Sequence, residues 1–176
     1  IDSNMIVLRK RTNIKNIFEI SNSKAIEKLN FFVSKVLFNI ISNSQYQYHN
    51  SNLLSKKNIQ KSISKVKSSN YDAIISHDCS GFLSFSQIYF LANILKSPVI
   101  FYPLDMEPFT GGCHYAWDCK LYSKNCYRCP AIIGSDPFKI SNKFLINKHK
   151  VISKLNHGVL AASQELYMQI KNSMLF

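Results

Sequence analysis

The stretch that decides the fold is YDAIISHDCSGFLSFSQIYFLANILKSPVIFYPL, residues 71–104. It opens with a short apolar run, which predicts a buried strand over 71–76. Residues 84–95 then carry apolar side chains at three- and four-residue steps, which predicts a helix. A second apolar run predicts a strand over 97–104. Because its apolar residues are continuous rather than alternating, this run is typical of a strand covered on both faces.

The same patterns continue on both sides of this unit. Toward the N-terminus they predict a strand over 4–10, a helix over 23–43 and a more basic helix marked by Leu54, Ile59, Ile63 and Val66. Toward the C-terminus they predict a helix that begins near 136–137, a strand over 157–163 and a helix over 164–174. Such alternation is typical of an α/β fold, so we expect a Rossmann-like parallel sheet with helices on both faces.

Size and charge limit the possible classes of protein. The chain of 176 residues is long enough for one domain with a real core. Its 22 Lys and Arg against 10 Asp and Glu give a net charge of +12. A surface this basic favours nucleic acid, an anionic membrane face or phosphorylated ligands, although scattered Lys residues also simply solubilise a surface. No apolar run reaches the roughly 18 residues that a membrane-spanning helix needs.

Polar residues follow the predicted strands at the edge of the sheet where ligands bind in parallel α/β folds. The loop after 71–76 carries His77, Asp78, Ser80 and Gly81. The loop after 97–104 carries Asp105, Glu107, Thr110, Gly111 and Gly112. We therefore expect a ligand site here, walled in part by an inserted cysteine-rich loop.

Each of these residues has a functional and a structural interpretation. His77 is either a proton acceptor and hydrogen-bonding partner for a ligand, or a buried histidine at a strand end. Asp105 either orients a ligand hydroxyl or caps backbone N–H groups of its own loop. Glu107 either carries charge into the cleft or faces solvent. The glycine pair 111–112 either lets the backbone approach a ligand or forms a turn.

The segment FTGGCHYAWDCKLYSKNCYRCP, residues 109–130, holds Cys113, Cys119, Cys126 and Cys129 in the spacing C-x5-C-x6-C-x2-C. Four thiolates suit a structural Zn²⁺ ion, and the last pair has the spacing of a metal knuckle. Disulfides, an iron–sulfur cluster and unligated thiols remain alternatives. His114 either replaces one thiolate or lies beside the site. Cys79 stands apart and is interpreted as a small buried residue.

The stretch LDMEPFTGGCHYAWDC, with two further cysteines and Pro130, closely resembles a signature in the amino-terminal domain of bacterial GT-B glycosyltransferases. These are retaining enzymes of the family-4 kind, used in surface polysaccharide assembly. The flanks YDAIISHDCSGFLS and GVLAASQELYMQIKNSMLF agree, so the resemblance covers nearly all of the chain. Two positions depart from it. Leu104 stands where the family often has His, and Glu107 stands where it often has Trp.

The resemblance implies that residues 1–176 are an incomplete, acceptor-side amino-terminal domain. The chain does not start with Met, which suggests that it is cut from a longer protein. Enzymes of the family that it resembles begin with a further strand and continue into a donor-binding second domain, so the resemblance implies that both lie outside residues 1–176. The complete enzyme would transfer a sugar, with retention, from a nucleotide-sugar donor to a polysaccharide or lipid-linked acceptor. This portion alone would not turn over. The implied catalytic residues are Asp105 and His77, and the implied substrate-binding residues are Asp78, Ser80, Gly81, Glu107, Thr110, Gly111, Gly112 and His114.

A lipid-linked substrate would also explain the basic surface, because anionic lipid attracts Lys and Arg. The predicted basic helix carries Lys56, Lys57, Lys61, Lys65 and Lys67. We therefore expect a cytoplasmic protein that attaches peripherally to the inner face of the plasma membrane.

Two other classes of protein compete with the transferase. A zinc-stabilised module that binds nucleic acid would cluster basic and aromatic residues on the metal loop, which carries Lys120, Lys124 and Arg128 with Tyr115, Trp117, Tyr122 and Tyr127. The parallel α/β pattern argues against this class, because such modules rarely need it. The third class is a non-catalytic remnant that binds a partner.

Overall fold

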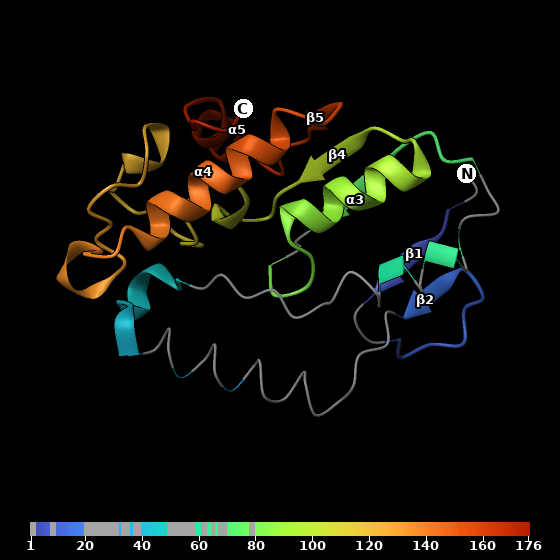
Figure 1. Cartoon of the computed structure of the whole chain (residues 1–176), viewed down its shortest axis with the longest axis horizontal. Coiled ribbons are helices and arrows are strands. Elements are labelled where there is room, and N and C mark those ends of the chain that lie inside the picture. The colour runs from blue at the N-terminus through green and yellow to red at the C-terminus, as the bar shows by residue number, and fades with distance from the viewer. Residues whose placement is uncertain are drawn as a thin grey trace.

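The chain is described here by a computed structural model, shown in Figure 1. The structure describes residues 3–7, 10–19, 32, 36, 40–48, 59–60, 63–64, 66, 70–77 and 80–176. Within them it has a mixed α/β fold with two small parallel sheets, β1-β2 and β3-β4-β5, and the helices α3, α4 and α5.

The predicted strand–helix–strand unit is confirmed as β3 (Ile74–His77), α3 (Phe85–Leu95) and β4 (Val99–Tyr102). The two strands pair in parallel, with Ile74 opposite Val99 and His77 opposite Tyr102. Helix α3 begins at a capping box, in which the Ser84 side chain accepts from the Gln87 N–H and the Gln87 side chain accepts from the Ser84 N–H. These two bonds satisfy backbone donors that a helix start leaves unpaired.

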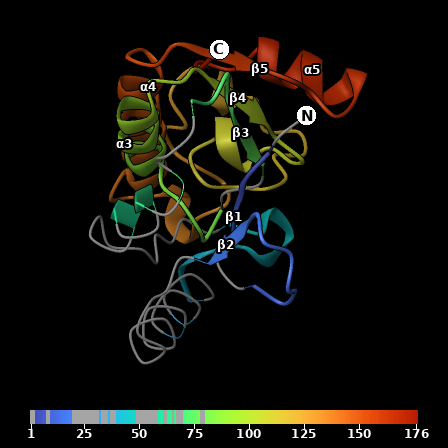
Figure 2. The same cartoon turned by 90° about the vertical axis from the view of Figure 1, so that its right-hand side faces the viewer.

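The second crossover runs through α4 (Ile140–Ile152) to β5 (His157–Val159), which also pairs in parallel with β4. In the strand order β3-β4-β5, each successive strand is added on the same side of the preceding one. Right-handed crossovers then place both connecting helices on one face of the sheet. Figures 1 and 2 show α3 and α4 side by side over this face. The predicted last helix is α5 (Gln164–Lys171), and Ser163 caps it by accepting from the Leu166 N–H at 3.1 Å.

Burial differs between the two faces of β4. Val99 and Phe101 are fully buried, and the Phe101 ring stacks on Phe85 of α3 with 5.3 Å between ring centres. Ile100 and Tyr102 alternate onto the other face and are only half-buried. In the described part of the chain, α3 and α4 therefore cover one face of this sheet, and the coarser prediction of an α/β fold with parallel strands is confirmed.

Helix α4 begins later than predicted. The first helical residue is Ile140, because residues 133–138 form turns and a short 3₁₀ segment in which Asp136 adopts a left-handed conformation. The Asp136 carboxylate accepts from the N–H groups of Ile140 and Ser141, both at 2.8 Å. The aspartate therefore caps the helix from four residues before it, where the sequence pattern had suggested the first helical turn.

The N-terminal sheet joins β1 (Met5–Val7) and β2 (Ile17–Glu19) in parallel. The first strand was predicted, whereas the second was not. The predicted helix 23–43 falls mostly outside the described residues, as does much of the predicted basic helix. Of the latter, the described residues Ile59, Ile63 and Val66 are buried, which is the inward face that their spacing predicts.

The described residues include no helix with the length and apolar character needed to cross a lipid bilayer.

The glycine pair lets the loop after β4 pack tightly against α4. A methyl group at Gly111 would lie 2.5 Å from the Ser141 carbonyl oxygen. Gly112 has φ +126°, and a methyl group there would lie 3.0 Å from the Tyr48 ring. The Tyr48 hydroxyl donates to the Gly111 carbonyl at 3.0 Å. The pair therefore serves close packing between the loop, α4 and Tyr48.

We expect Gly111→Ala to destabilise the fold by about 1–3 kcal/mol, because a clash with backbone atoms forces the loop away from α4. Gly158→Ala is the matched control, since a methyl group there meets nothing within 4 Å. Urea unfolding followed by circular dichroism measures both. Equal stability of the two variants would contradict the proposed packing.

Candidate functional site

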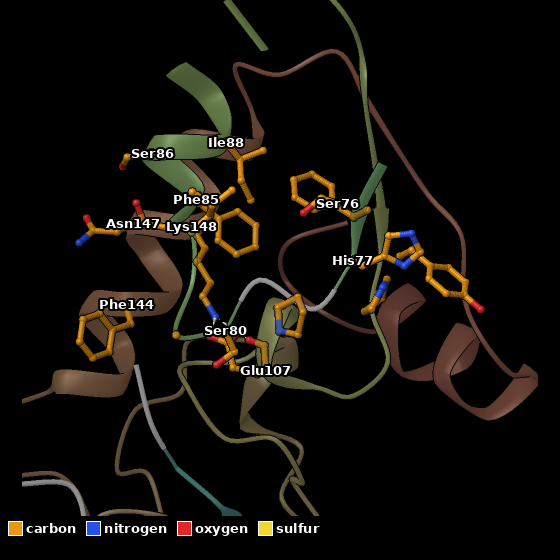
Figure 3. Close-up of a pocket in the computed structure, with 17 residues that line it drawn as sticks. Ser76, His77, Ser80, Phe85, Ser86, Ile88, Glu107, Phe144, Asn147 and Lys148 are labelled. Atoms are coloured by element: carbon orange, nitrogen blue, oxygen red, sulfur yellow. Dashed lines mark hydrogen bonds and ion pairs between the residues drawn. The ribbon is translucent and has the colours of Figure 1, made fainter. Parts of the chain in front are cut away.

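A cavity of about 190 Å³ lies where β3 and β4 end. Because the strands are parallel, the loops that leave their carboxyl ends meet at one edge of the sheet. Its aromatic lining comes from Phe85, Phe101, Tyr102 and Phe144, and its polar and charged lining from Ser76, His77, Ser80, Ser84, Ser86, Glu107, Asn147 and Lys148. The predicted edge of the sheet therefore does carry a cavity, shown in Figure 3.

Asp105 and His114 form a close pair next to this cavity. The Asp105 Oδ2 atom lies 2.6 Å from His114 Nδ1, and its Oδ1 atom accepts from the Glu107 N–H at 2.8 Å. A carboxylate only accepts, so the Nδ1 atom of His114 carries the proton and its Nε2 atom is left to accept. The Nε2 atom lies 3.5 Å from the Ser80 hydroxyl oxygen. The structure therefore brings together three of the predicted site residues.

Backbone hydrogen bonds hold His114 in place. Its N–H donates to the Tyr46 carbonyl at 3.1 Å, and its carbonyl accepts from the Met106 N–H at 3.1 Å. The backbone of His114 is thus tied to Tyr46 on one side and to Met106 of its own loop on the other, and the residue is 8 % exposed. His114 contacts Asp105 and Ser80, so its alternative role as a zinc ligand gains no support.

A buried ion pair joins α4 to the loop after β4. The Lys148 ammonium lies 2.7 Å from the Glu107 carboxylate and also donates to the carbonyl oxygens of Glu107 and Thr110. It sits 5.4 Å from the centre of the Phe85 ring. Both Lys148 and Glu107 are buried, so the interpretation of Glu107 as a solvent-facing residue is wrong.

Lys148 was missed by the sequence analysis, although the sequence contains a signal for it. Helix α4 buries Ser141, Leu145, Lys148 and Ile152, spaced by four, three and four residues. A lysine at an apolar position of that spacing indicates a buried charge that needs partners.

Thr110 serves the loop itself. It is 0 % exposed, its hydroxyl donates to the Cys113 carbonyl at 2.8 Å, and its oxygen accepts from the Gly112 N–H at 3.2 Å. In the structure, Thr110, Gly111 and Gly112 serve the internal packing of the loop. Their predicted role in binding a ligand stays a prediction.

The two other predicted residues of the first loop occupy different places. His77 packs edge-on against Tyr102, with 5.1 Å between ring centres. Gly81 lines the cavity with φ +70°, a conformation that glycine adopts at little cost. Asp78 and Cys79 lie outside the described residues.

The four cysteines of the loop are free thiols gathered in the core. Burial raises the pKa of Cys113 and of Cys126 to about 12, and burial also raises the pKa of Cys129. The neighbouring cysteine sulfurs act in the same direction on all three pKa values. Over residues 80–176 and the other described positions, no three His, Cys, Asp or Glu side chains have the arrangement of a metal site. The predicted zinc ion therefore stays a prediction without support from the geometry.

The chain matches no family model, no curated protein and no solved structure.

We expect Lys148→Met to destabilise the chain by about 3–5 kcal/mol, because it leaves the Glu107 carboxylate buried without its cation. Lys150→Met is the control, since Lys150 is exposed on the same helix, and we expect a change within about 0.5 kcal/mol. Adding Glu107→Gln to Lys148→Met should recover part of the loss. Equal urea midpoints for the two lysine variants would show that the buried pair does not form.

The thiols give a second expectation. At pH 8 a thiol with a pKa of about 12 is almost entirely protonated, and iodoacetamide reacts with the thiolate. After chelator treatment and reduction, Cys113 and Cys126 should therefore react at least about 100-fold more slowly in the folded chain than in urea. Equal rates would contradict their burial.

Elemental analysis of the purified, reduced protein decides the zinc prediction: one zinc per chain supports it, and none removes it.

Proposed function

We propose that the chain is the acceptor-side portion of a retaining, nucleotide-sugar-dependent glycosyltransferase with a Rossmann-like GT-B architecture. The observation that carries this proposal is the chemistry of the cavity at the carboxyl edge of β3 and β4. Its walls combine hydroxyl and amide groups with aromatic rings. The resemblance of residues 104–130 to the glycosyltransferase signature supports the same conclusion.

A sugar suits such walls because it has both polar edges and apolar faces. The hydroxyls of Ser80 and Ser76 and the amide of Asn147 offer donors and acceptors for sugar hydroxyls. The rings of Phe85 and Phe144 offer flat apolar surface. Small-molecule sites generally combine an apolar lining with a few polar groups that fix the orientation of the ligand.

The remaining roles follow from this assignment. The nucleotide diphosphate of the donor would bind mainly to a second domain, and helix N-termini and basic side chains there would stabilise the leaving diphosphate. Asp105 would act through His114 rather than touch the sugar, since both of its oxygens are engaged within the loop. By itself the chain would bind a sugar without transferring it.

Attachment to the inner face of the plasma membrane belongs to the same proposal. The net charge of +12 supports it, because anionic lipid attracts basic residues. Lys56, Lys57, Lys61, Lys65 and Lys67, on which the sequence analysis based it, lie outside the described residues.

One observation favours the nucleic-acid alternative. Trp117 is 65 % exposed, and its ring lies 5.9 Å from that of Tyr115 on a loop that also carries Lys120 and Lys124. Exposed aromatic rings beside basic residues can stack on bases. Oligonucleotide binding that weakens steeply with salt would favour this alternative over the sugar transferase.

Saturation-transfer NMR tests the proposed function on the chain as it exists. The probes are a panel of hexoses, 6-deoxyhexoses, N-acetylhexosamines and their disaccharides. We expect at least one class of sugar to receive magnetisation from the protein. Asn147→Ala should reduce this signal at least about threefold by removing one amide partner worth about 1 kcal/mol.

The control for this experiment is Lys143→Ala, because Lys143 is exposed on the same helix and does not line the cavity. It should leave the sugar signals unchanged. If the folded chain gives no signal with any of the sugars, or if both variants behave alike, sugar binding in this cavity is wrong.

A further inference from the structure

Ser80, His114 and Asp105 form a connected line of side chains that ends at the cavity. Asp105 Oδ2 lies 2.6 Å from His114 Nδ1, and His114 Nε2 lies 3.5 Å from Ser80 Oγ. Ser80 lines the cavity, whereas His114 is buried behind it. A hydroxyl backed by an imidazole that is itself oriented by a carboxylate is the arrangement that activates serine nucleophiles.

The topology explains how three residues so far apart in sequence meet. Ser80 lies between the end of β3 and the start of α3, and Asp105 lies just beyond the end of β4. Because these strands are parallel neighbours, their two loops share one edge of the sheet. His114 then comes back to Asp105 through the loop that Lys148 ties to α4. The chain order, Ser then Asp then His, is one in which such triads occur in α/β proteins.

The geometry meets the requirements for orienting the imidazole. The second oxygen of Asp105 is held by the Glu107 N–H, so the carboxylate cannot rotate away from His114 without losing that bond. The Nδ1 proton is therefore directed at the carboxylate and the Nε2 lone pair at Ser80. The 3.5 Å between Nε2 and Oγ exceeds the usual range of about 2.6–3.2 Å, and such distances are often longer before a ligand binds.

The start of helix α3 and the Lys148–Glu107 ion pair border the same space. Phe85 and Ser86, in the first turn of the eleven-residue helix α3, line the cavity, and the N-terminus of a helix carries a partial positive charge. Figure 3 shows Ser80, Glu107 and the amine end of Lys148 together at one end of the cavity. Charge that develops on an oxygen next to Ser80 would therefore be stabilised.

We propose that Ser80 is a nucleophilic serine that takes up the acyl group of a small ester. Its Oγ atom attacks the ester carbonyl carbon while its proton passes to His114 Nε2. The bond from that carbon to the alcohol oxygen then breaks, and the leaving alcohol takes the proton from His114. Water attacks the resulting acyl-serine ester by the same route, which releases the carboxylic acid and restores Ser80. This activity is separate from sugar transfer and does not depend on it.

The size of the cavity limits the acyl group. A volume of about 190 Å³, part of which the alcohol portion must use, suits an acetyl or similarly short group rather than a long fatty chain. The polar walls favour an alcohol portion that carries hydroxyl groups of its own.

The experiment uses a fluorophosphonate probe, which forms a covalent bond to activated serine oxygens and releases fluoride. The folded chain is incubated with the probe, and the labelled peptide is identified by mass spectrometry. We expect labelling at Ser80, loss of that label in Ser80→Ala, and an at least about 100-fold slower rate in His114→Gln and in Asp105→Asn. Ser123→Ala, an exposed serine outside the site, should label at the original rate.

Further measurements keep the test decisive if a variant unfolds. Circular dichroism and thermal unfolding establish which variants are folded, and Asp105→Asn preserves the shape of the side chain. Incubating the original chain with p-nitrophenyl acetate should add one acetyl group to Ser80. The proposal is overturned if the original chain is not labelled, if the label lies on another residue, or if folded His114→Gln and Asp105→Asn label as fast as the original chain. The labelling experiment and the sugar NMR experiment have independent results, so either proposal can be overturned while the other stands.

Discussion

The buried ion pair between Lys148 and Glu107 is the interaction on which the rest of the site depends. A lysine ammonium removed from water is costly unless every proton finds an acceptor, and here the Glu107 carboxylate and the carbonyls of Glu107 and Thr110 accept them. These acceptors all belong to the loop after β4, whereas the lysine belongs to α4. The loop therefore cannot leave the helix without separating two buried charges that have each other as partners.

This constraint turns an irregular loop into a rigid support. The Glu107 N–H holds Asp105, Asp105 holds His114, and the backbone of His114 bonds to Tyr46 and Met106. In the described part of the chain, every buried side-chain nitrogen and oxygen has a hydrogen-bond partner. The side chains nearest the cavity are held by groups that are themselves fixed. Sites supported in this way keep their geometry without a ligand. Both proposed activities, sugar binding and acylation of Ser80, would need a hydroxyl held at a fixed position, which this arrangement supplies.

Local patterns predicted the regular elements well where short-range interactions decide them. Helix α3 has its cap at Ser84 and buries Ile88 and Leu91, and α5 has its cap at Ser163, because capping and helical spacing depend on residues three or four apart. The pattern failed for β2 and for the start of α4. Three residues are too few to show a period. The cap of α4 comes from Asp136 across a turn at Gly-Ser-Asp-Pro, residues that also suit a helix start.

The sequence by itself determined the order of the strands and helices from β3 to α5, the edge of the sheet where polar residues gather, and the clustering of four cysteines and two glycines in one segment. It did not determine which of those polar residues meet. Asp105 pairs with His114, and His114 reaches Ser80, whereas His77 lies against Tyr102. Lys148 comes from a helix and lies more than thirty residues farther along the chain than His114. Only the tertiary structure decided this, because the partners of a buried polar group depend on which distant segments of the chain lie next to it. Desolvation then stabilises these pairings, since a polar group that is buried without a partner costs about 1–3 kcal/mol or more.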